Sequence, residues 1–211
     1  RFEIEDEGPV VADRREREIR GLAVKSLGEH WSGGVEGATE SSTFENIEVA
    51  FEAAPAVEFN LFPYSQYTRR QLRLKYGVGL RHATYYEETI YGKLEETHPV
   101  HTAEVAFERT EPWGSLDTRL EWSQYLHDLS LSRLEAEGEL SWRLVRGLSF
   151  SVEGRASRIR DQISLPRRGA TEEEVLLELR ELRSGYEYGV SFGVTYTFGS
   201  IFSAIVNPRF G

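Results

Sequence analysis

Two histidines in this chain come nearest to the spacing of a metal site. His98 and His101 have the H-x-x-H spacing, and a zinc site would need both imidazoles on one side of an element together with a third ligand. The segment His98-Pro-Val-His101 reads as a loop, so no helix brings the two rings to one side, and no further ligand follows at a suitable spacing. We therefore predict no metal and no cofactor.

Nucleophilic catalysis lacks the residue sets that it needs. The chain has no cysteine, which removes thiolate chemistry, and no G-x-S-x-G turn of the kind that exposes a catalytic serine. The glycines of Trp31-Ser-Gly-Gly34 begin a strand and do not precede a helix, so they do not form a phosphate-binding loop. We predict that the protein is not an enzyme.

Charged residues that alternate with apolar ones form the largest group with a shared pattern. Between Leu134 and Leu144, Leu, Ala, Gly and Trp alternate with Glu, Ser and Arg. Isolated buried charges cost several kcal/mol, so the charged face meets water, and we predict that it lines a wet lumen. The predicted lumen residues are Arg73, Lys75, Arg81, Glu104, Glu108, Arg119, Glu121, Glu135, Glu137, Glu139, Glu153 and Arg155.

These charges could act in two ways. If neighbouring strands set Arg73, Lys75 and Arg81 against Glu104 and Glu108, ion pairs would cross-link the lumen and close it to flow. The other interpretation is a solvated wall without such pairing.

The elements that carry this pattern are strands, because the alternation has a period of two. We predict about ten strands, at 1–6, 14–27, 30–42, 47–60, 68–83, 99–110, 115–127, 132–145, 147–160 and 184–198. One segment differs: Thr171 and Glu174 form a capping box before leucines at helical spacing. It predicts a short loop helix near 171–183, which either folds on its own strands or covers the mouth of the barrel.

The links between these strands alternate in length. Compact links at 27–30, 61–64, 111–114 and 145–147 alternate with polar or longer ones at 43–46, 84–98, 127–131 and 161–183. Outer-membrane barrels have short periplasmic turns and longer outer loops. We therefore predict an all-β fold, an up-and-down antiparallel transmembrane β-barrel over residues 1–198, followed by a C-terminal tail at 199–211.

Aromatic residues beside the compact links agree with a membrane position. Trp31, Phe62, Tyr64 and Trp113 lie there, where an interfacial girdle would be, although ordinary packing at strand ends would also place them there. The mean hydropathy of −0.46 leaves no run of about 18 apolar residues for a spanning helix. Alternation alone does not say which face is inside, so a soluble β-barrel that binds an apolar ligand stays open as an alternative.

The net charge limits the partners. A formal charge of −10 and a pI of about 5.1 argue against nucleic acid, since phosphate binding needs Lys and Arg gathered on one surface. The absence of cysteine is compatible with a periplasmic or surface location.

The last predicted strand has a recognisable spacing. Ser191, Gly193, Tyr196 and Phe198 resemble the polar-x-Gly-x-x-aromatic-x-aromatic pattern that closes bacterial outer-membrane barrels. The resemblance implies an assembly signal that the barrel assembly machinery of that membrane reads. In the family pattern this strand usually closes the chain, whereas here Gly199–Gly211 follow.

The chain from about residue 20 to 211 resembles an uncharacterised family of bacterial outer-membrane β-barrel proteins, of which it would be the C-terminal barrel portion. The similarity is carried by "FNLFPYSQYTRRQL", the segment His82–Lys93, "EPWGS", "SQYLHDLS", "SRIRDQISLP", "GATEEEVLL" and "YTFGSIFSAIVNPRFG". It implies the bacterial outer membrane and contact with its lipid, but no activity. From the strand pattern we predict a non-enzymatic, porin-like structural or pore-forming subunit that could join other envelope proteins in a larger surface assembly. His127-Asp128 is superficially similar to outer-membrane proteases, but their paired aspartates have no counterpart, so a barrel enzyme is the lesser alternative.

Overall fold

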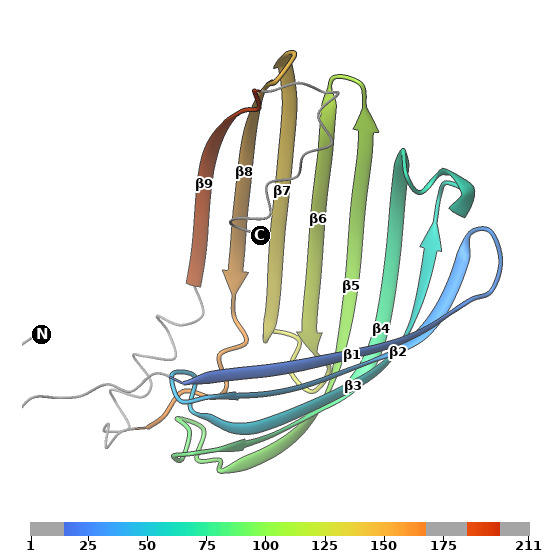
Figure 1. Cartoon of the computed structure of the whole chain (residues 1–211). Helices are drawn as coiled ribbons and strands as arrows, with labels where there is room; N and C mark the ends of the chain where they lie inside the picture. Colours follow the sequence, from blue (N-terminus) through green and yellow to red (C-terminus); the bar gives the residue numbers. More distant parts are fainter. Residues whose placement is uncertain (1–14, 168–184, 199–211) are drawn as a thin grey trace, which may run out of the picture.

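One antiparallel sheet accounts for almost all of the described chain. The computed structural model describes residues 15–167 and 185–198 (Figure 1). Nine strands follow one another in sequence order, so each pairs with the next. They are β1 (Glu16–Ser26), β2 (Trp31–Ser42), β3 (Ile47–Asn60), β4 (Arg70–Tyr85), β5 (Glu95–Glu111), β6 (Gly114–Tyr125), β7 (Ser132–Val145), β8 (Leu148–Ile159) and β9 (Gly185–Tyr196). A single turn of 3-10 helix, η1 (Tyr64–Gln66), interrupts the link between β3 and β4.

The all-β, antiparallel, up-and-down prediction is confirmed. The predicted strands 47–60 and 132–145 have the bounds of β3 and β7, and most other ends differ by one or two residues. The largest error is at β5, which begins at Glu95 where the sequence predicted a loop as far as residue 98. The predicted strand 1–6, the loop helix near 171–183 and the tail 199–211 lie outside the described residues.

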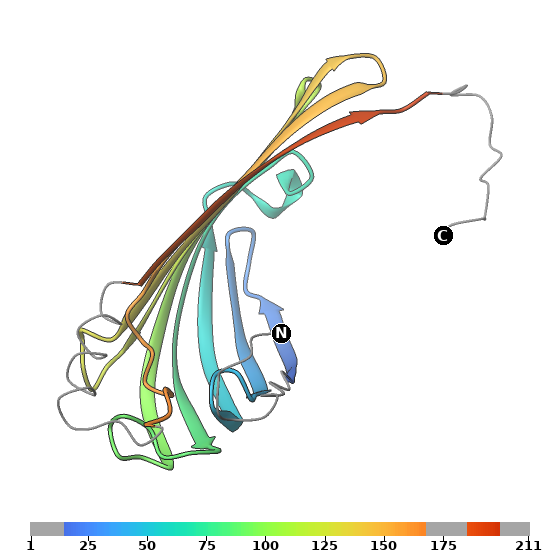
Figure 2. The same ribbon diagram turned by 90° about the vertical axis from the view of Figure 1, so that its left-hand side faces the viewer.

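The sheet is strongly curved but is not closed into a barrel (Figures 1 and 2). Within the described ranges, β1 and β9 each pair on one side only. Because every neighbouring pair is antiparallel, the two edge strands run in the same direction. Direct pairing of β1 with β9 would be parallel, so an all-antiparallel closure needs an odd number of further strands.

The two faces of the sheet differ in character. The predicted lumen residues all lie on one face, which we call the polar face, because the register places Lys75, Glu104, Glu121 and Glu135 in one row across β4 to β7. The polar face is the inside of the curve, since Lys75 of β4 reaches Glu36 of β2 over the intervening strand. The opposite face, which we call the apolar face, is convex and carries most of the exposed large hydrophobic residues.

Small residues on the polar face allow the tight bend between β2 and β4. Ala50, Ala83, Gly77 and Gly79 are buried on the concave side of β3 and β4. A Cβ atom on Gly79 would lie 2.5 Å from the carbonyl oxygen of Ala53, so only glycine fits at that close approach. Larger side chains on the inside of this bend would force the sheet to open.

A segment that follows β8, residues 160–167, crosses the polar face and is called here the crossing segment. The amide of Ile90 donates to the carbonyl of Leu165 at 2.9 Å, and that of Arg167 donates to Glu88 at 2.9 Å, so the segment joins β8 to the β4–β5 link. Its Ile163 is buried with Val100, Tyr125 and Leu131. This small core lies at the end of the sheet where the long loops are, and Figure 1 shows the segment there in orange.

Asn46 joins three parts of this end. It has a positive φ of 61° and is 4% exposed. Its Nδ2 donates to the carbonyls of Glu87 at 2.9 Å and Ser164 at 2.8 Å, and its Oδ1 accepts from the amide of Glu87 at 2.9 Å. One side chain therefore ties the β2–β3 turn to the β4–β5 link and to the crossing segment.

We expect Asn46→Ala to lower the free energy of unfolding by about 4 kcal/mol, since three hydrogen bonds are lost at about 1 kcal/mol each and alanine at this positive φ costs about 1 kcal/mol more. Asn46→Gly should lose about 1 kcal/mol less, because glycine adopts a positive φ without strain. Urea titration of the folded protein measures both. Equal stability of wild type and Asn46→Ala would show that the hydrogen bonds of the Asn46 side chain do not contribute to the stability of the fold.

Candidate functional site

Ion pairs gather on the polar face around one buried carboxylate. Glu104 is 5% exposed, and its Oε2 lies 3.2 Å from Lys75 Nζ and 3.3 Å from an Arg119 guanidinium nitrogen. Lys75 also donates to Glu36 at 2.8 Å. The lysine therefore links β2, β4 and β5, and the buried carboxylate is held by cations from two strands.

Two arginines of β4 make similar links. Arg73 pairs with Glu108 of β5. Arg81 pairs with Glu40 of β2, and its other terminal nitrogen lies 3.5 Å from Glu52 of β3. Of the two interpretations, pairing with β5 holds for Arg73 and Lys75. Arg81 pairs with β2 and β3 instead, because the curvature brings β2 within its reach.

The part of the polar face on β6 to β9 has fewer cations near its carboxylates. Asp117, Glu139 and Glu153 stand directly opposite one another across β6, β7 and β8. Glu153 accepts a hydrogen bond from the Ser191 hydroxyl at 3.3 Å. Among the remaining predicted lumen residues, Glu135 has a partner in Arg133 at 3.3 Å, whereas Glu121, Glu137 and Arg155 have no ion pair with a described residue.

Several polar residues of this network were not among the predicted lumen residues. They are Glu36, Glu40, Glu52, Arg133 and Asp161. Glu36 and Glu40 were not predicted as lumen residues, because β2 has small residues on both faces and its apolar and polar positions do not alternate clearly. Asp161, whose Oδ2 lies 3.0 Å from Arg133 Nε, belongs to the crossing segment, and no periodicity marks it.

The predicted assembly-signal residues lie at the free edge of the sheet. Ser191 and Gly193 face the polar side of β9, and Tyr196 is its last residue. Phe198 follows the strand, and its ring stacks on that of Tyr196 with centroids 6.1 Å apart. Both rings are largely exposed.

The H-x-x-H pair does not form one site. His98 and His101 lie in β5, not in a loop, and their odd separation sends them to opposite faces. His101 is 3.0 Å from Gln124 Oε1 and 3.1 Å from the Tyr76 hydroxyl, whereas His98 is 2.6 Å from Glu96 and stacks on His127 with centroids 3.7 Å apart. No group of three or more residues with metal-ligand geometry occurs in 15–167 and 185–198.

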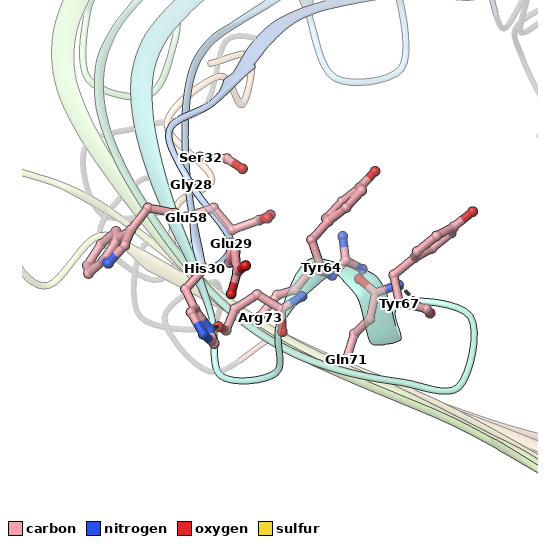
Figure 3. Close-up of a pocket in the computed structure, with 11 residues that line it drawn as sticks. Gly28, Glu29, His30, Ser32, Glu58, Tyr64, Tyr67, Gln71 and Arg73 are labelled. Atoms are coloured by element: carbon pink, nitrogen blue, oxygen red, sulfur yellow. Dashed lines mark hydrogen bonds between the residues drawn. The ribbon is translucent and has the colours of Figure 1, made fainter.

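A hollow opens on the polar face at the end of the sheet where the short turns are (Figure 3). Its volume is about 220 Å³. We call it the turn-end hollow. Its walls come from the β1–β2 turn, the ends of β2, β3 and β4, and η1; they are Gly28, Glu29, His30, Trp31, Ser32, Glu58, Asn60, Tyr64, Tyr67, Gln71 and Arg73. The sequence indicated Trp31 and Tyr64 as turn aromatics but not that they share a hollow.

Comparison of the chain with protein-family models, with curated proteins and with solved structures found no match. In the part of the chain that the structure describes, no helix has the length and apolar character to cross a membrane.

We expect Lys75→Met to lower the free energy of unfolding by about 2–4 kcal/mol, because it leaves the Glu104 carboxylate buried with less compensation. The double variant Lys75→Met/Glu104→Gln should recover most of that loss. Arg155→Met is a matched control on the same face, since Arg155 has no ion pair in the described ranges. Chemical unfolding measures all three, and an unchanged Lys75→Met variant would contradict the role of the pair.

Burial of the His127 imidazole, and then the neighbouring His98, lowers the pKa of His127 below its ordinary value of 6.5. The unfolded chain therefore takes up this proton first as the pH falls, so this contribution to stability is complete above pH 6.5 and decreases below it. Proton NMR titration should place the pKa of His127 below 6.5. His98→Phe should raise it, because the ring remains while the repelling charge is removed; no change would contradict the coupling.

Proposed function

We propose that the chain forms part of the wall of a transmembrane β-barrel in the bacterial outer membrane, as a structural or pore-forming subunit. The observation that carries the proposal is the exposed apolar face. Leu74 on β4 is 45% exposed and Phe192 on β9 is 71% exposed, and similar side chains cover the convex side of the strands between them. Water is a poor solvent for a continuous apolar surface of this extent, whereas lipid tails are a good one.

The charges on the apolar face support the same conclusion. Within the nine described strands, ionised side chains on that face stand within three residues of a strand end; they are Arg17, Lys25, Arg70, Glu95, Arg109, Glu111 and Arg158. Between those ends the face carries none. A lipid-facing surface requires this, since an Arg or Lys at the bilayer midplane costs about 2–4 kcal/mol in a barrel.

The dimensions of the apolar band also fit. From Leu72 to Leu80 the strand rises about 27 Å, and a tilt of about 40° reduces this to about 21 Å along the membrane normal. Outer-membrane barrels have an apolar band of about 25 Å. Trp31 and Phe59, with ring centroids 4.8 Å apart, lie at one border of the band. Tyr186, near the start of β9, lies at the opposite border.

The alternatives receive less support. A soluble barrel that binds an apolar ligand would hold its apolar face inside, but the concave face here is the charged one. A barrel enzyme would need a clustered nucleophile and base, and the described residues present no such set. We propose outer-membrane lipid and the barrel assembly machinery as partners, and further strands, from this chain or from other envelope proteins, as the closure between β1 and β9.

Gel mobility of the detergent-folded protein, with and without boiling, tests the membrane barrel first. Closed membrane barrels resist SDS until heated, so the unboiled sample should migrate differently from the boiled one. Identical mobility, together with a monomer that stays in solution without detergent, would contradict the proposal.

Two neighbouring substitutions test which face meets lipid. Leu140 lies on the apolar face and Ser141 on the polar face of β7. We expect Leu140→Arg to lower the free energy of unfolding of the vesicle-folded protein by about 2–4 kcal/mol, and Ser141→Arg to change it by less than about 0.5 kcal/mol. Urea titration of the vesicle-folded protein measures both, and the reverse order would place the polar face outside.

A further inference from the structure

The turn-end hollow has walls from four parts of the chain that the fold brings together. Glu29 and Ser32 come from the β1–β2 turn and the start of β2, Glu58 from the end of β3, Tyr64 from η1 and Arg73 from the start of β4 (Figure 3). Its volume is about 220 Å³, whereas a cavity of about 150 Å³ is large enough to hold benzene. A ligand group with several carbon atoms therefore fits.

Several polar groups on the walls of the hollow are already engaged, although one buried nitrogen of Arg73 is not. Arg73 pairs with Glu108 through a terminal nitrogen, and its Nε has no partner but is buried. The Gln71 amide donates to the carbonyl of Tyr67 at 3.0 Å. The Asn60 side-chain oxygen accepts from the amides of Phe62 at 3.2 Å and Leu72 at 3.3 Å. These groups hold the walls of the hollow in place.

The carboxylates of the hollow are not engaged in this way. The side chains of Glu29 and Glu58 have neither an ion pair nor a hydrogen bond with any residue in 15–167 and 185–198. Glu29 is exposed and Glu58 half-buried. Because Arg73 is neutralised by Glu108, which stands outside the hollow, the lining keeps two uncompensated negative charges.

Two tyrosine rings line the same hollow as these carboxylates. The Tyr64 and Tyr67 rings stack with centroids 5.3 Å apart and an interplanar angle of 17°, as Figure 3 shows for the two labelled side chains. Tyr64 is 66% exposed and Tyr67 is 51% exposed, so the outer ring faces remain open. The face of an aromatic ring attracts a cation, most strongly one that gives up its water easily.

We propose that the turn-end hollow binds a small organic cation, with a quaternary or alkylated ammonium group between the carboxylates of Glu29 and Glu58 and the ring of Tyr64. Carboxylates supply the charge that this group needs, and the tyrosine supplies an apolar, electron-rich face for its alkyl carbons. A metal ion fits the hollow less well, because no three-ligand set occurs among the described residues. The site does not depend on whether the sheet spans a membrane.

Calorimetry of the folded full chain with choline tests the proposal. The detergent should be a nonionic maltoside, since a phosphocholine headgroup would itself present a quaternary ammonium group. We expect saturable binding of choline, and at least tenfold weaker binding of its neutral carbon isostere, dimethylbutanol. Equal binding of the two compounds, or no saturable binding of choline, would overturn the proposal.

Variants locate the site. Glu58→Gln should weaken choline binding about three- to fivefold, and the double variant with Glu29→Gln should weaken it further. Tyr64→Leu should weaken it about threefold, whereas Tyr64→Phe should not, because the ring face remains. Glu139→Gln is the control, a carboxylate of the same polar face outside the hollow. Far-UV circular dichroism checks that each variant is folded, and unchanged affinity in a folded Glu29→Gln/Glu58→Gln variant would overturn the assignment.

Discussion

The register of the strand ladder is the constraint on which the rest of the structure depends. In a sheet, a slip of one residue exchanges the two faces of a strand. Here such a slip would turn Lys75 toward the apolar face and leave Glu104 without its nearest cation. Lys75 pairs with Glu36 of β2 and with Glu104 of β5, on the two sides of β4, and Arg81 pairs with Glu52 of β3. These ion pairs favour one register over its neighbours as well as compensating charge.

Curvature follows from what each face can hold. Glycine and alanine on the inside of β3 and β4 let the sheet bend, and the bend brings long side chains of β4 within reach of β2. The crossing segment then joins β8 to the β4–β5 link, which holds distant strands at a fixed separation. The bend is therefore supported by side chains over part of its length and by backbone hydrogen bonds at one end.

Sequence periodicity predicted the strands best where the two faces differ most. β3 and β7, with apolar residues on one side and Glu on the other, were predicted to the residue. The prediction was wrong at Glu95–His98, because there both faces of β5 are polar and alternation carries no signal. Contacts that skip a strand, such as Arg81 with Glu40, and the turn-end hollow depend on curvature, which no periodicity in the sequence encodes.

The two ends of the polar face differ in a way that bears on its use. At the long-loop end, Ile163 of the crossing segment is buried against Val100 and Tyr125, so described residues cover the face there. At the short-turn end the hollow is open and lined by uncompensated carboxylates. A cation that approaches from the short-turn side is therefore attracted by these carboxylates before it reaches the paired charges of β4. An anion that approaches from the same side is repelled by them. Among the residues that the structure describes, the two ends of the polar face therefore differ in both shape and charge.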